Sequence, residues 1–133
     1  MSKVWIKVDE KHNNKMIGAK IYLSGPMTSF IEAGKEDEAR EIFEIAENNF
    51  KNLGYEVANP FKNGLDKNDK WIRHIRKDLE MLDDCNIICY LHTCELLSSP
   101  GGDMEKIAAR REKKREMREI KHDNGDYEYA FIN

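Results

Sequence analysis

The segment that most constrains the fold is NIICYL at 86–91, in which an asparagine is followed by five apolar residues without a break. A strand with one face in water alternates apolar and polar residues, whereas a strand covered on both faces is apolar throughout. Such a strand is typical of the middle of a parallel sheet with helices on both sides. The chain is therefore expected to supply helices before and after this strand.

The periodicity of the flanking segments predicts those helices. Between about 36 and 53, apolar residues recur at steps of three and four, which indicates an amphipathic helix ended by Gly54. A third helix is expected from about 103 to 120, with an almost wholly charged second half. The second helix, from about 70 to 84, is expected to carry on one side Trp71, Ile75, Leu79 and Leu82.

Further strands are expected before each of the first two helices. The segment IYL at 21–23 ends at Gly25, and YEVANPF at 55–61 is ended by Pro60. The opening segment KVWIKV (3–8) and the tail DNGDYEYAFIN (123–133) are candidates for short strands at the sheet edges. The alternation of strands and helices predicts an α/β protein with a parallel sheet and helices on both faces.

Composition bounds the function. A chain of 133 residues fits one domain, 1–133, with a core at about 20–110 and a charged helix extension and tail at 110–133. The net charge of −3 argues against a dedicated nucleic-acid binder. No apolar run approaches the ~20 residues that span a bilayer, so we expect a cytoplasmic protein without a membrane partner.

The three cysteines, Cys85, Cys89 and Cys94, lack the close spacing of a metal site, and His92 alone adds little. We expect them to be reduced and structural. Neither glycine-containing loop, SGPMTS (24–29) or HTCELLSSPGG (92–102), matches a dinucleotide or P-loop fingerprint. Together with the loop NPFKNG (59–64), both should nevertheless lie at the carboxyl ends of strands, where ligands bind in parallel sheets.

Two carboxylates are candidate catalytic groups. Glu105 falls in the first turn of the expected third helix, so either it complements the helix terminus, like Asp103, or it is a carboxylate kept ionised for nucleophilic attack. Asp78 lies beside the apolar stripe of the second helix, where a raised pKa suits a general acid. The alternative is that Asp78 pairs with Arg73 or His74. Local position leaves both questions open.

Four segments together resemble the nucleoside 2-deoxyribosyltransferase superfamily. They are IYLSGPMT (21–28), GYEVANP (54–60), IRKDLEMLDDCNIICYL (75–91) and SSPGGDMEKIAA (98–109). Within the superfamily the chain looks closest to a small phage and bacterial branch, and it is similar to the deoxynucleoside 5′-monophosphate N-glycosidases. The resemblance implies a flavodoxin-like or Rossmann-like three-layer sandwich with a mainly parallel sheet. It also implies cleavage of the N-glycosidic bond of a deoxynucleoside or its 5′-monophosphate, by hydrolysis or deoxyribosyl transfer.

The resemblance assigns roles residue by residue. Glu105 falls on the nucleophile, Asp78 on the group that holds the sugar and protonates the departing base, and Tyr22 on a neighbour of the nucleophile. The residues that would bind substrate, with Ser99 at the 5′-phosphate, are Ser24, Gly25, Pro26, Asn59, Ser99, Gly101 and Gly102. The resemblance further implies a small-molecule substrate, no metal or cofactor, and a homodimer or higher homo-oligomer.

Two other functions compete with this reading. One is a non-catalytic protein that binds a nucleotide in the same pocket, although a binder needs neither of the two acids. The other is an interaction module on the last helix, where 106–121 contains eight basic and three acidic side chains. Such a run is more often a solvated helix face.

Overall fold

The computed structural model describes residues 2–7, 19–95 and 100–132. Its elements, in chain order, are β1 (Val4–Lys7), β2 (Lys20–Ser24), α1 (Thr28–Glu32), α2 (Glu36–Asn52), β3 (Glu56–Ala58), the 3₁₀ turn η1 (Pro60–Lys62), α3 (Trp71–Asp83), β4 (Ile87–Tyr90), the 3₁₀ turn η2 (His92–Glu95), α4 (Pro100–Arg111), β5 (Arg115–Lys121) and β6 (Tyr127–Phe131). The short elements α1, η1 and η2 follow strands and were not expected from the sequence.

The described strands form one sheet in the order β1-β6-β5-β4-β2-β3. Strands β3, β2, β4 and β5 are parallel, β6 runs antiparallel to β5, and β1 pairs with β6 in parallel. Counted from β2, the four parallel strands lie in the order second, first, third, fourth, as in flavodoxin-like sheets. The expected α/β fold with a mainly parallel sheet is therefore confirmed.

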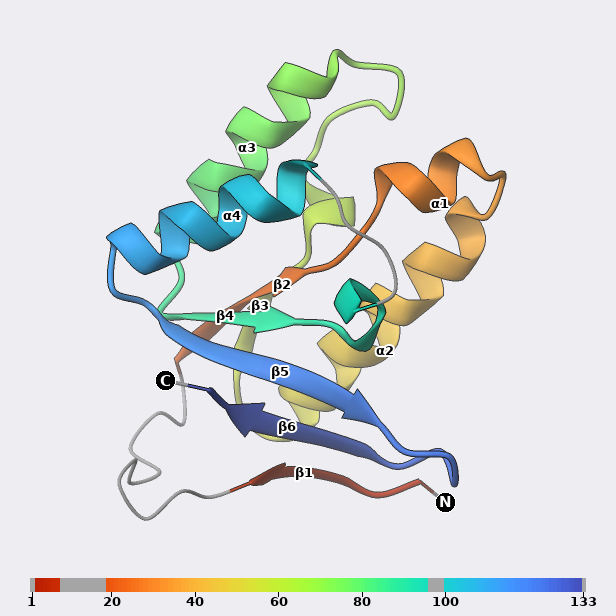
Figure 1. Ribbon diagram of the computed structural model, residues 1–133, viewed down its shortest axis with the longest axis vertical. Helices are drawn as coiled ribbons and strands as arrows, with labels where there is room; N and C mark the ends of the chain where they lie inside the picture. Colours follow the sequence, from red (N-terminus) through yellow and green to blue (C-terminus); the bar gives the residue numbers. More distant parts are fainter. Residues whose placement is uncertain (1, 8–18, 96–99, 133) are drawn as a thin grey trace.

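Alternate side chains of the interior strand β2 enter two separate cores. Ile21 and Leu23 pack with Phe43 and Phe50 of α2 on one face of the sheet. Tyr22 packs on the other face with a cluster that includes Leu82 of α3 and Ala109 of α4. Figure 1 shows the same division, with α1 and α2 on one side of the sheet and α3 and α4 on the other. These are the three layers expected from the sequence.

The expected continuation of the third helix to residue 120 is wrong. Helix α4 ends at Arg111 because Lys113 adopts φ +56° and the amide of Lys114 donates to the carbonyl of Ala109. This is the left-handed helix ending that glycine usually provides, made here by lysine without the usual sequence signal. Residues 115–121 then form β5, so the proposed basic helical interaction module does not exist as one helix.

Strand β5 was not predicted from the sequence because two of its buried side chains are acids, which break the apolar pattern of a buried strand. Glu116 and Glu119 are 6% and 4% exposed, and Met117 between them is fully buried. Tyr90 and Arg110 contact the Glu116 carboxylate, whereas Tyr129 donates to Glu119 at 2.6 Å. Buried carboxylates with such partners look like surface charges in the sequence.

Both terminal segments form strands, as expected. The tail strand β6, however, lies between β1 and β5 and not at the sheet edge. Strand β1 forms that edge. Across the described ranges, no helix has the length and apolar character needed to cross a membrane. Cys85, Cys89 and Cys94 are free thiols, the first two buried.

Candidate active site

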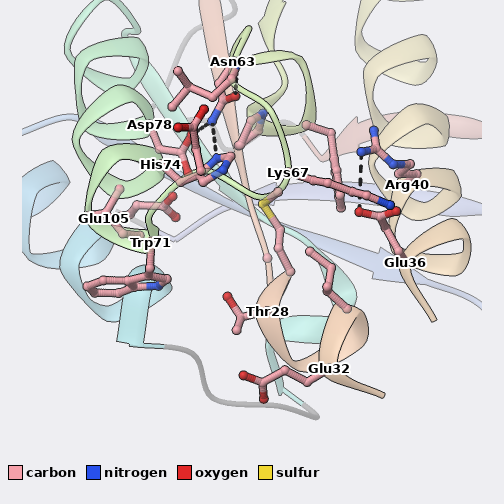
Figure 2. Close-up of a pocket in the computed structure, with 18 residues that line it drawn as sticks. Thr28, Glu32, Glu36, Arg40, Asn63, Lys67, Trp71, His74, Asp78 and Glu105 are labelled. Carbon is pink, nitrogen blue, oxygen red and sulfur yellow. Dashed lines mark hydrogen bonds and ion pairs between the residues drawn. The ribbon is translucent and has the colours of Figure 1, made fainter. Parts of the chain in front are cut away.

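A cavity of about 300 Å³ opens beyond the carboxyl end of β2. The loop after β2, helices α1 to α4, and the segment after β3 all contribute to its walls. Glu105 and Asp78 lie on one side of it, and Arg40 and Glu36 lie on the opposite side (Figure 2). A cavity of this size suits a small molecule, and its place is where parallel sheets bind ligands.

The carboxylate of Glu105 is held by two hydroxyl groups from β2. Tyr22 Oη donates to Oε1 at 2.5 Å, and Ser24 Oγ donates to Oε2 at 2.7 Å. All three residues are buried, with Glu105 only 6% exposed. Because Tyr22 and Ser24 are two positions apart on one strand, their side chains point to the same face. The arrangement fixes both oxygens of the carboxylate.

The expectation that Glu105 lies in the first turn of the third helix is wrong. Helix α4 begins at Pro100, so Glu105 lies in its second turn, beyond the first turn in which the helix dipole acts strongly. Burial raises the pKa of Glu105 to about 7, while the hydroxyl groups of Tyr22 and Ser24 lower it and the nearby Asp78 raises it further. The hydroxyl groups of Tyr22 and Ser24, and not the helix terminus, therefore stabilise the ionised form of Glu105.

Asp78 is buried on the cavity side of α3, as expected from its place beside the apolar stripe. It is 5% exposed, and burial raises its pKa to about 6 against the opposing effects of Asn63 and His74. Its hydrogen-bond partner is Asn63, whose Nδ2 donates to Oδ1 at 3.0 Å. The pairing with Arg73 is absent, because Arg73 instead binds Asp69. A buried carboxyl with a raised pKa can hold or release a proton near neutrality.

The model of one protein family matches residues 19–117, and its description is Domain of unknown function (DUF4406). The chain belongs to the DUF4406 family. A comparison with curated proteins found no match.

The DUF4406 match runs from the residue before β2 into the first half of β5. The described residues that line the cavity all fall within it, from Gly25 to Glu105. Strands β1 and β6 lie wholly outside the matched region. The cavity therefore belongs to the part of this chain that defines it as a DUF4406 protein.

The other residues expected to bind substrate divide into three groups. Gly25 lines the cavity, and Pro26 beside it is fully buried. Asn59 is engaged elsewhere, because its side chain accepts from the amide of Phe61 and donates to Glu47. Gly101 and Gly102 belong to the first turn of α4, and Ser99 lies outside the described residues.

The sequence places Asn63 in NPFKNG (59–64), one of the loops expected at a strand end, but indicates no role for Asn63 itself. In the structure Asn63 is buried against Asp78 and His74. Trp71 was expected in the core, but it is 46% exposed and lines the cavity. The available signal was His74, one helical turn before Asp78, which places a second polar group on the same side of α3.

Proposed function

We propose that the chain cleaves the N-glycosidic bond of a deoxynucleoside or a deoxynucleoside 5′-monophosphate. The observation that supports this most is the buried Glu105 carboxylate, which receives hydrogen bonds from Tyr22 and Ser24 beside a second buried acid, Asp78. Two carboxyl groups in one cavity suit glycosidic cleavage, which needs a nucleophile on one side of the sugar and an acid at the leaving group. The choice of deoxynucleosides as the substrate class rests on the resemblance of four segments to the nucleoside 2-deoxyribosyltransferase superfamily.

In the first step, an ionised oxygen of Glu105 attacks the anomeric carbon and forms an ester bond to it. The bond between that carbon and the base nitrogen breaks, and its electron pair goes to the base. Protonated Asp78 gives its proton to the departing base. In the second step, water or an acceptor base attacks the same carbon and gives its proton to Asp78. The carboxylate of Glu105 is then released.

The charges in the cavity favour a state with one proton on the two acids. Burial raises the pKa of Glu105 to about 7 and that of Asp78 to about 6, and the Asp78 carboxylate adds to the rise at Glu105. The productive state has the proton on Asp78 and the charge on Glu105, and it is the minor singly protonated form because the pKa of Glu105 is the higher of the two. Tyr22 and Ser24 stabilise this state because both donate to Glu105. Activity should therefore be highest between about pH 6 and pH 7.

The proposal includes a cytoplasmic location, chemistry by side chains alone, and self-association at least to a dimer. Adjacent helices α3 and α4 expose Ile72 (48%) and Ile107 (59%), and exposed apolar side chains of this kind favour association. Light scattering of the chain in solution would measure its oligomeric state. A monomer at micromolar concentration would contradict this part of the proposal.

Chromatography of free bases released from a panel of deoxynucleosides and their 5′-monophosphates tests the activity. Release is expected with the wild-type chain and the exposed control Glu112→Gln, and no release is expected with Glu105→Gln. Repeating the assay with an added acceptor base separates hydrolysis from transfer. If no substrate loses its base but nucleotides bind, the chain is a non-catalytic nucleotide binder.

A further inference from the structure

The amide of Asn63 lies at the centre of a small buried network beside the cavity. Asn63 is 7% exposed, and its Oδ1 accepts from the backbone amide of Leu65 at 3.0 Å. Its Nδ2 lies 3.0 Å from Asp78 Oδ1 and 3.2 Å from Nδ1 of His74 (Figure 2). Each end of this amide therefore has a partner.

The backbone of Leu65 decides which way the Asn63 amide points. A backbone N–H can only donate, so Oδ1 must face Leu65 and the NH₂ group must face Asp78 and His74. In the neutral form of His74, Nδ1 is then an acceptor, and the ring hydrogen lies on Nε2, which donates to the carbonyl of Asp66 at 2.9 Å. Both hydrogens of the Asn63 NH₂ group have acceptors, and a reversed amide would lose the bonds at both ends.

We propose that Asn63 is a positioning residue for Asp78, holding Oδ1 so that Oδ2 is presented to the departing base. This inference rests on the proposed function. Within the described residues, Oδ2 of Asp78 makes no hydrogen bond, and Asp78 lines the cavity. A side chain held at one oxygen loses little further freedom when the other oxygen meets a substrate.

The hydrogen bond from Asn63 to Asp78 also changes the pKa of Asp78. Asn63 lowers the pKa of Asp78 against the effect of burial, because an N–H donor stabilises the ionised carboxylate. The titratable groups that face Asp78 are His74 on α3, Tyr22 on β2 and Glu105 on α4. Removal of the donor should therefore let Asp78 keep its proton to higher pH.

Two variants of the full chain test the proposal. Asn63→Ala removes the donor, and the isosteric Asn63→Asp keeps an acceptor for Leu65 but turns a carboxylate toward Asp78. For both, kcat of base release should fall by up to about 100-fold, with a smaller change in KM. The alkaline limb of the pH–rate profile should move to higher pH in Asn63→Ala and further in Asn63→Asp. Asn68→Ala, in the same loop, should match the wild type in both measurements.

A second readout does not depend on activity. The ¹³C carboxyl resonance of Asp78, assigned by its loss in Asp78→Asn, should titrate at higher pH in both variants than in the wild type. An unchanged titration, or an unchanged kcat in variants of an active enzyme, would overturn the proposal. If the wild type releases no base from any substrate, the proposed function fails. The NMR titration then still decides whether Asn63 holds Asp78.

Discussion

The hydroxyl of Tyr22 donates a 2.5 Å hydrogen bond to Glu105 across 83 positions of the chain. Strand β2 supplies the donor and helix α4 supplies the acceptor, and both residues are buried. A charge-assisted hydrogen bond in such a place is strong because no water competes for either group. It links the two segments on which the proposed chemistry depends.

Loss of this bond should change the pH dependence of activity. In Tyr22→Phe one donor to Glu105 is absent, so the pKa of Glu105 should rise above about 7. The acidic limb of the pH–rate profile should then move to higher pH, and each unit of movement lowers activity on that limb about tenfold. Rates of base release between pH 5 and pH 9 would measure it. An unmoved limb in a folded variant would show that Tyr22 does not stabilise the charge.

Replacement of Glu105 should stabilise the fold at high pH. The pKa of Glu105 is about 7 in the folded chain and near 4.5 in the unfolded chain, so the folded state binds more protons between these values. Stability of the wild type therefore falls as pH rises from 4.5 to 7, by about 3 kcal/mol. The Glu105→Gln variant has no carboxyl group at this position, so its stability should not fall in this way as the pH rises.

Urea denaturation at pH 5 and pH 8 would test this stability difference. The advantage of Glu105→Gln over the wild type should be larger at pH 8. The exposed Glu112→Gln should show no comparable dependence on pH. An equal difference between Glu105→Gln and the wild type at both pH values would be evidence against a raised pKa.

Asp78→Asn should slow the release of base without unfolding the chain. Its amide oxygen can still accept from Asn63 but its side chain cannot donate a proton to the base as an acid. General acid catalysis contributes roughly 10²- to 10⁴-fold, so kcat should fall within that range. The loss should be greatest for bases that leave poorly without a proton. Equal losses for good and poor leaving groups would exclude Asp78 as the acid.

Glu119→Ala should destabilise the fold strongly although the residue lies in a charged run. Glu119 accepts from Tyr129 and from the ring nitrogen Nδ1 of His92, and it is 4% exposed. Truncation leaves the buried Tyr129 hydroxyl and the half-buried His92 ring nitrogen without this acceptor, which costs about 3 kcal/mol or more. Thermal or urea unfolding would measure the change, with Glu112→Ala as the exposed control. A change below 1 kcal/mol would contradict the assignment of β5 as a buried strand.

Ligands in the cavity should change the fluorescence of Trp71. Its indole lines the cavity and is 46% exposed, whereas Trp5 stacks on His122 in a different part of the structure. A Trp5→Phe chain therefore reports on Trp71 alone. Titration with deoxynucleoside 5′-monophosphates should give a saturable change in emission. A saturable signal that persists in Trp5→Phe/Trp71→Phe would show that it does not come from Trp71.

The sequence by itself determined the strands β2, β3 and β4, the helices α2 and α3, and the place of Asp78 beside the apolar stripe of α3. These follow from apolar periodicity, which records how neighbouring residues are shielded from water. Only the tertiary structure showed that residues 115–121 form a strand, because the partners that permit its acids to be buried come from other strands. It also decided the hydrogen bonds of Glu105 and that of Asn63 to Asp78. Their hydrogen-bond partners are distant in sequence and meet only when the sheet and helices pack.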